Sequence, residues 1–133
     1  MTLFRINNSN KLTKIKENSF KLEKEIQTIT ENNLNEIFNL EFVKSELQLK
    51  GLRIDTLAYD KESKSFVIIE YKRGESSTVI DQGYAYLSLM LNNKAEFILS
   101  LIDKYDKNLE RNLIDWSQSR IIFISTSFLI HQK

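Results

Sequence analysis

Three charged residues, Asp55, Glu70 and Lys72, have the types and spacing that chemistry on a phosphodiester requires. Asp55 follows one apolar stretch, and Glu70 and Lys72 close a second one after a short polar turn. Side chains two residues apart along a strand point to the same face, so Glu70 and Lys72 would project together. Asp55, on the neighbouring strand of a hairpin, would reach the same spot. Two carboxylates and an ammonium group at one point suit a metal-dependent phosphodiesterase.

The chemistry follows from the charge on the substrate. A phosphodiester resists attack because its oxygens repel the nucleophile; a Mg²⁺ ion relieves that repulsion and lowers the pKa of a bound water. Such an ion needs only one or two protein carboxylates besides phosphate and water. Asp55 and Glu70 fit as ligands, and the carbonyl of Tyr71 would add a third. Lys72 would orient the attacking water or neutralise developing charge.

The same residues also have a purely structural interpretation. Asp55 would be a polar residue on an exposed strand face, and Glu70 and Lys72 a same-face ion pair that contributes about 0.3–1 kcal/mol. The metal site is favoured because a buried apolar strand rarely ends in a carboxylate and a lysine without a reason.

Composition limits the alternatives. The chain has 133 residues, which predicts a single domain over 1–133, and 41% hydrophobic with 28% charged residues is ordinary for a soluble globular protein. The net charge of +1 gives no general basic signature for nucleic acid. Cysteine is absent and His131 is the one histidine, which excludes disulfides and disfavours zinc enzymes. No apolar run reaches about 18 residues, so we expect no membrane span and a cytoplasmic location.

The remaining pattern predicts an α/β fold with a mixed central β-sheet flanked by helices. Residues 3–15 are typical of an N-terminal β-hairpin. Apolar residues at three- and four-residue steps predict one long or two short helices over 22–38, with the break at Asn32 and Asn33; they are Leu22, Ile26, Ile29, Leu34, Ile37 and Phe38. We expect strands at 41–49, 52–59, 66–73 and 121–124, and helices at 79–91 and 98–109.

The pattern of Asp55 followed by Glu70-x-Lys72 resembles the signature of the PD-(D/E)xK nuclease superfamily. Residues 51–57 and 67–73 are similar to the nuclease domain of archaeal and actinobacterial mismatch endonucleases, and more so to small uncharacterised bacterial proteins related to them. The likeness extends from residue 3 to about residue 128. It implies a restriction-endonuclease-like core and a deoxyribonuclease that uses Mg²⁺ or Mn²⁺.

The resemblance also implies roles for further residues. Such domains carry a glutamate in the helix before the sheet, which Glu25 matches, and it would ligate or orient a metal-bound water. Many carry Gln-x-x-x-Tyr after the lysine, which Gln82 and Tyr86 match. Gln82 would hold the substrate phosphate or order the lysine, and the i, i+4 spacing puts both on one helical face. Arg53 and Arg73 flank the site and would contact DNA phosphates together with Tyr86.

Two alternatives stay open at this point. Relatives usually continue past the strand at 121–125 with a further helix and strand, so the tail is either dispensable or missing from a truncated form. A shortened sheet would leave an edge strand and favour a partner or a homodimer. The main functional alternative is a catalytically inactive domain that retains the nuclease scaffold and binds nucleic acid or another protein.

Overall fold

The computed structural model describes residues 19–72, 79–105 and 113–125, with only the backbone of residues 19 and 20. The elements, in chain order, are α2 (Ser19–Asn32), α3 (Leu34–Phe38), β1 (Glu41–Leu49), β2 (Leu52–Asp60), β3 (Ser65–Lys72), α4 (Val79–Leu91), α5 (Lys94–Lys104), the 3-10 helix η3 (Trp116–Gln118) and β4 (Arg120–Ser125). The hairpin predicted over 3–15 lies outside the described residues. None of the described helices is long and apolar enough to cross a bilayer.

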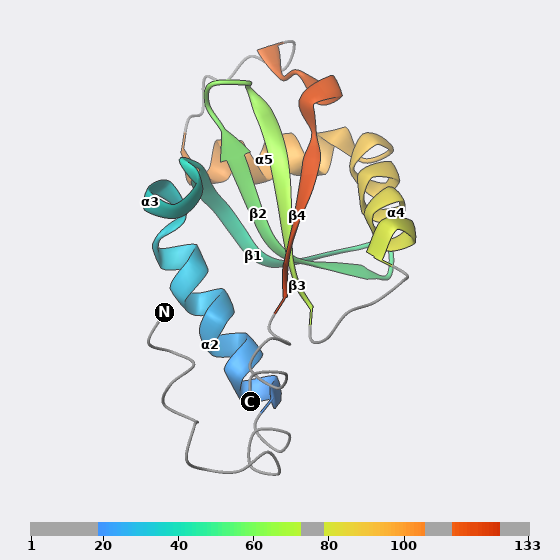
Figure 1. The fold of residues 1–133 in the computed structure, drawn as a ribbon. Coiled ribbons are helices and arrows are strands. Elements are labelled where there is room, and N and C mark those ends of the chain that lie inside the picture. The colour runs from blue at the N-terminus through green and yellow to red at the C-terminus, as the bar shows by residue number, and fades with distance from the viewer. Residues whose placement is uncertain (1–18, 73–78, 106–112, 126–133) are drawn as a thin grey trace, which may run out of the picture.

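The four strands form one mixed sheet in the order β1-β2-β3-β4 (Figure 1). The first three strands are antiparallel neighbours, and β4 joins β3 in parallel. The predicted α/β class with a mixed sheet flanked by helices is therefore confirmed. The strand ranges also match the predicted ones closely. The match is clearest for β3, which is buried along nearly its whole length and is therefore apolar on both faces.

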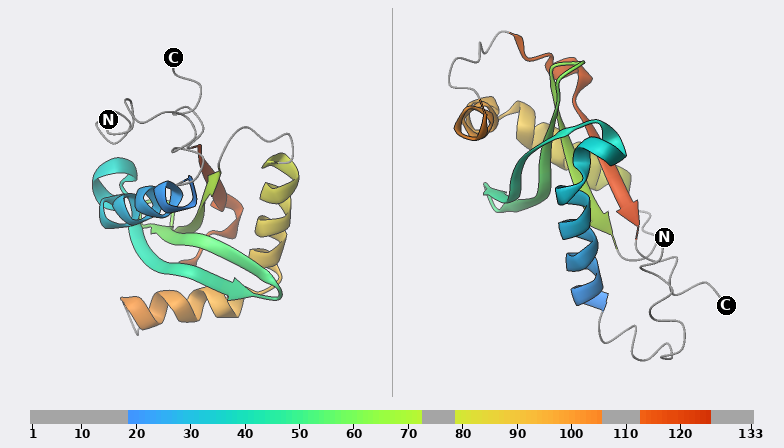
Figure 2. Two further views of the ribbon diagram at one scale, coloured as in Figure 1. Left: turned by 90° about the horizontal axis from the view of Figure 1, so that it is seen from below. Right: turned by 90° about the vertical axis from the view of Figure 1, so that its left-hand side faces the viewer.

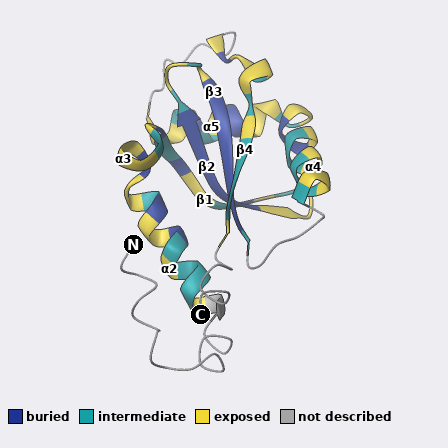
Figure 3. Cartoon of the chain, viewed as in Figure 1, coloured by how far each residue is buried: buried dark blue, intermediate teal, exposed yellow. Residues whose placement is uncertain are grey.

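Helices cover both faces of the sheet. In Figure 2, α2 and α3 lie on one side of it and α5 on the other, while Gly83 of α4 faces Ile121 and Phe123 of β4. The two faces correspond to two core clusters, one around Phe66, Phe97 and Met90 and a smaller one under α2 and α3. Figure 3 shows β2 and β3 buried over most of their length.

The predicted helix over 22–38 is two helices, separated at Asn33. Helix α3 ends at Asn39, whose φ of 57° is the left-handed conformation that asparagine adopts at helix ends. The N–H of Asn39 donates to the carbonyl oxygen of Asn35, and the N–H of Leu40 donates to that of Leu34. A chain reversal at this point leads directly into β1.

The predicted buried face of these helices is correct in part. Leu34 is buried, and Ile26 and Phe38 pack against the same core cluster, but Ile29 and Ile37 are 42% and 50% exposed. In α2 the buried positions are instead Gln27 and Thr30, which lead to Leu34 at three- and four-residue steps. Polar side chains are accepted on this face because α2 packs over a polar part of the sheet.

That polar part is a fork at which the central strands separate. Pairing of β2 with β3 runs from Asp60–Ser65 to Thr56–Ile69 and stops there. Beyond it β2 remains paired with β1 alone, and β3 continues with β4 as far as Lys72. In Figure 1 the tip of the β1–β2 hairpin swings away from the ends of β3 and β4. We use the term fork for the point marked by Glu46, Asp55 and Glu70.

An irregularity in β1 faces the same point. The pairs Ser45–Thr56 and Leu47–Ile54 flank Glu46 and Asp55, and Glu46 has a φ of 55°. In a regular strand Ile54 and Leu57 would point to opposite faces, yet both lie in the larger core cluster. The strand β2 therefore turns over at Asp55, which places this residue at the fork and frees its main chain from the ladder.

The β1–β2 turn gives the first test. Lys50 and Gly51 form a two-residue loop between the pair Leu49–Leu52, and both have positive φ, 53° and 84°. Gly51→Ala should lower the free energy of unfolding by about 1–2 kcal/mol, since a Cβ there meets no atom but imposes backbone strain. Lys50→Asn should raise it, because asparagine tolerates this conformation. Urea unfolding measures the free energy of unfolding of both variants. If both substitutions changed it by the same amount in the same direction, the positive-φ turn at Lys50 and Gly51 would be wrong.

Candidate functional site

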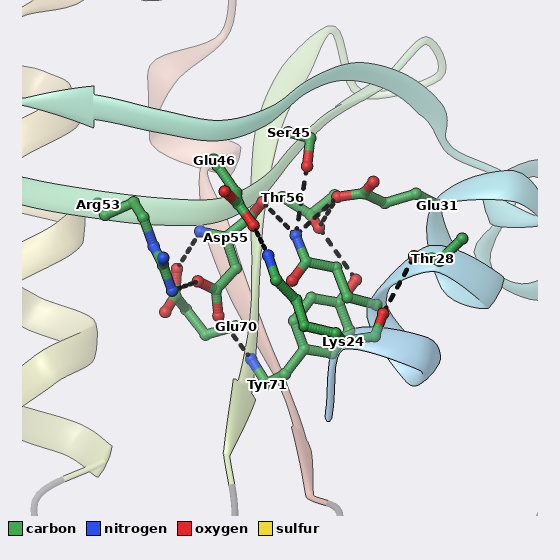
Figure 4. A network of polar contacts seen from close by, with 11 residues as sticks. Lys24, Thr28, Glu31, Ser45, Glu46, Arg53, Asp55, Thr56, Glu70 and Tyr71 are labelled. Carbon is green, nitrogen blue, oxygen red and sulfur yellow. Dashed lines mark hydrogen bonds and ion pairs between the residues drawn. The ribbon is translucent and has the colours of Figure 1, made fainter. Parts of the chain in front are cut away.

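The two carboxylates cross between β2 and β3 at the fork. The N–H of Asp55 donates to Glu70 Oε2 over 2.8 Å, and the N–H of Tyr71 donates to Asp55 Oδ2 over 3.1 Å (Figure 4). Asp55 and Glu70 are 8% and 5% exposed. Each side chain thus satisfies a main-chain donor of the other strand, where pairing of the two strands has ended. The structure therefore brings together Asp55 and Glu70, as the sequence predicted.

The pair is electrostatically unfavourable. Burial, together with the charge of Asp55 and a side-chain hydrogen bond with it, raises the pKa of Glu70 to about 8. The Asp55 N–H and the charge of Lys72 act in the opposite direction. Lys72 is half-buried two residues along β3. The two carboxylates of the predicted triad are thus together, the charge of Lys72 acts on Glu70, and a further positive charge there would relieve the repulsion.

Arg53 supplies one such charge. Its Nη2 lies 3.2 Å from Asp55 Oδ1, and its side chain is half exposed. The sequence predicted a phosphate contact for this arginine; the structure shows it as the ion-pair partner of Asp55. Because the pair is open to solvent on the arginine side, its contribution to stability is small.

Helix α4 brings one more predicted residue, Tyr86, to the fork. The hydroxyl of Tyr86 donates to the carbonyl of Arg53 over 3.2 Å. Burial, followed by the charges of Glu70 and Asp55, raises the pKa of Tyr86 to about 12, so its phenol stays a hydrogen-bond donor at neutral pH. One turn earlier, Gln82 Oε1 is buried without a hydrogen-bond partner in the part of the chain that the structure describes.

One predicted residue, Glu25, is not brought to the fork. Glu25 is exposed on α2, two positions from Gln27, and therefore on a different side of the helix from the buried stripe. Its predicted contact with a metal-bound water finds no support in this placement. Arg73 lies outside the described residues.

The residues that α2 does present were missed by the sequence analysis. Gln27 Nε2 lies 3.0 Å from the carbonyl oxygen of Asp55 and 3.1 Å from Glu31 Oε2. Glu31 Oε2 also accepts from Thr56 Oγ1 over 2.6 Å, and the Tyr71 hydroxyl lies 3.0 Å from the same Thr56 oxygen. A buried polar network thus joins α2 to both strands on the other side of the fork.

The signal for these residues was present but ambiguous. Glu23, Gln27, Thr30 and Leu34 lie on one helical stripe, which a search for apolar residues ranks below the stripe containing Ile26 and Ile29. The stripe that contains Gln27 could have been ranked first only by knowing that the sheet facing α2 is polar.

The arrangement provides hard oxygen donors but few of them. Within residues 19–72, 79–105 and 113–125, no group of three or more acidic or histidine side chains surrounds one point. Asp55, Glu70 and a main-chain carbonyl would leave most of a coordination shell to water and phosphate, which is usual for Mg²⁺. Asp55, Glu70 and the Tyr71 carbonyl are the groups at the fork that could hold such a cation.

The raised pKa of Glu70 predicts how stability depends on pH. Its folded-state value of about 8 lies above the unfolded value of about 4.3, so the folded protein holds a proton that the unfolded chain releases. This stabilisation is complete below the unfolded pKa and is lost as the pH rises toward 8, by at most about 1.4 kcal/mol per pH unit. Glu70→Gln should flatten the decline.

Urea unfolding between pH 5 and pH 9 in a chelator measures the effect, with the exposed Glu62→Gln as the matched control. If the free energy of unfolding changed with pH in the same way for wild type and Glu70→Gln, Glu70 would ionise normally in the folded protein.

Comparison with known proteins finds a relative whose activity is not described. The sequence is 50% identical over 117 residues to an uncharacterised protein of Haemophilus influenzae, and the match covers 88% of this chain and 39% of that protein. The chain therefore spans about two fifths of the length of this relative. No protein-family model matches the sequence, and no solved structure matches it. These comparisons assign no activity to the residues at the fork.

Proposed function

We propose that the chain is a nuclease domain of the PD-(D/E)xK type that hydrolyses DNA phosphodiester bonds with Mg²⁺ or Mn²⁺. The observation that carries the proposal is the pair of buried carboxylates at the fork, with Lys72 next to Glu70 on β3. Burying two acidic groups side by side costs stability, and neutral amide oxygens could accept the same main-chain hydrogen bonds. A cation-binding function explains why they are there.

Asp55, Glu70 and the Tyr71 carbonyl would hold the cation. The raised pKa of Glu70 supports this assignment, because it reflects first the burial of the carboxyl group and then the charge of Asp55, and a bound divalent cation would favour the ionised form against both. When bound, the cation would neutralise the phosphate oxygens and promote ionisation of a water molecule.

The other residues act through their own charges and hydrogen bonds. The Lys72 ammonium would orient the attacking water and stabilise the negative charge that develops on the phosphate. Tyr86, kept protonated by its surroundings, holds the main chain at Arg53. The Arg53 guanidinium is half exposed, so a DNA phosphate can approach it from solvent. Cleavage of both strands would require two copies, so a homodimer is part of the proposal.

One observation favours a second candidate, a domain that binds DNA or protein without cutting. Asp55 Oδ1, Asp55 Oδ2 and Glu70 Oε2 each accept a hydrogen bond from the protein itself. Carboxylate oxygens that already accept these hydrogen bonds would hold the two strands together at the fork without a cation. DNA binding that falls steeply with salt, without metal-dependent cleavage, would distinguish this candidate.

Removal of one cation ligand is the direct test of activity. Asp55→Asn should reduce Mg²⁺- or Mn²⁺-dependent cleavage of plasmid and oligonucleotide DNA to the level seen in EDTA, because a neutral amide is a poor ligand for a hard cation. The exposed Glu62→Gln should cleave as wild type does. Equal background cleavage by wild type and Asp55→Asn would refute the catalytic proposal.

Lys72 should affect rate more than binding. Lys72→Met removes the ammonium group and should lower the single-turnover cleavage rate on the order of 100-fold or more. DNA affinity in Ca²⁺ should change much less, since one cation among several phosphate contacts is lost. A variant that loses affinity and retains its rate at saturating DNA would place Lys72 in substrate binding instead.

A further inference from the structure

The side chain of Gln27 is deeply buried and fully engaged at the fork. It is 6% exposed, and its amide nitrogen lies 3.0 Å from the Asp55 carbonyl, 3.1 Å from Glu31 Oε2 and 3.3 Å from Ser45 Oγ. Its two N–H bonds are thus shared among three acceptors, all of them on or next to the fork. A side chain held in this way has little freedom to move.

The Asp55 carbonyl needs this donor because the ladder fails to supply one. Glu46, opposite Asp55 in β1, has a φ of 55°, and the regular pairs resume only on either side of it. A buried carbonyl oxygen without a donor is costly. Gln27 therefore takes the place of a strand partner.

Asp55 is consequently held through its main chain from two sides. Glu70 accepts from its N–H, and Gln27 donates to its carbonyl. We infer that Gln27 is a positioning residue, which fixes the Asp55 backbone so that the carboxylate stays beside Glu70. The inference deepens the proposed function and rests on it where Asp55 is taken as a cation ligand.

Other contacts fix the helix that carries Gln27. Lys24 forms an ion pair with Glu46, and Glu31 accepts from Thr56. Helix α2 is thus tied to β1 and to β2 on either side of Asp55. A displacement of α2 would be transmitted to the Asp55 main chain through Gln27, which makes the geometry of the carboxylate pair depend on the docking of this helix.

Two substitutions separate hydrogen bonding from packing. Gln27→Met retains the length of the side chain but has no donor, and Gln27→Glu retains the shape but sets a carboxylate against Glu31 and the Asp55 carbonyl. Thr28→Ala is the matched control, since Thr28 is the next residue of α2, is exposed, and bonds only within the helix among the contacts shown.

Two measurements on the full chain report the effect. Gln27→Met should weaken Mn²⁺ binding to the free protein by about 10-fold or more, the usual cost of losing a residue that supports a metal ligand, and Gln27→Glu should weaken it further. Amide hydrogen exchange should become faster at Asp55 and Tyr71 in both variants, with exchange at Ala58 and Val67 unchanged. Thr28→Ala should match wild type in both measurements.

The inference is overturned if Asp55 exchanges as in wild type, or if the four amides accelerate together, which would mean a general loss of packing. Unchanged Mn²⁺ affinity in Gln27→Met also overturns it. A wild-type protein that binds no Mn²⁺ would refute the proposed function instead, and the exchange pattern would still decide whether Gln27 positions Asp55.

Discussion

The rest of the structure depends on the main-chain hydrogen bonds that the carboxylates of Asp55 and Glu70 accept between β2 and β3. The strands β2 and β3 can separate inside the protein only if the main-chain donors released from the ladder find other partners. The Asp55 N–H finds Glu70, and the Tyr71 N–H finds Asp55. The same two side chains therefore create the fork and form the acidic pair within it.

The arrangement that satisfies these main-chain donors also places two acidic groups next to each other. Two acidic groups sit side by side away from water, and their burial, with the charge of Asp55 as a smaller cause, raises the pKa of Glu70. Arg53 and Lys72 reduce it from one side, and a proton or a divalent cation would reduce it further. In the proposed function the unfavourable charge is the source of cation affinity, so structure and activity compete for the same oxygen atoms.

The sequence was informative where local pattern determines structure. Asp55, Glu70 and Lys72 could be found because apolar runs mark the strands, and period-two alternation puts Glu70 and Lys72 on one face. Tyr86 and Gln82 were predicted from the resemblance to the nuclease superfamily, and helical spacing adds only that they share one face.

The rest depends on non-local geometry. The fork arises from the conformation of Glu46 and the end of strand pairing, and nothing near Asp55 in the sequence signals either. Glu25 was chosen from the family resemblance. Gln27 was missed because polar helix residues are usually solvated, and only the polar sheet beneath α2 makes its stripe a buried one.

The most direct test of the central claim is a crystal of the protein soaked in Mn²⁺ and measured at the manganese absorption edge. Our account predicts an anomalous peak between the carboxylates of Asp55 and Glu70, within coordinating distance of the Tyr71 carbonyl, with the Arg53 guanidinium displaced from Asp55 Oδ1. Full-occupancy density for the Arg53–Asp55 pair, with no peak at the fork at saturating Mn²⁺, would contradict it.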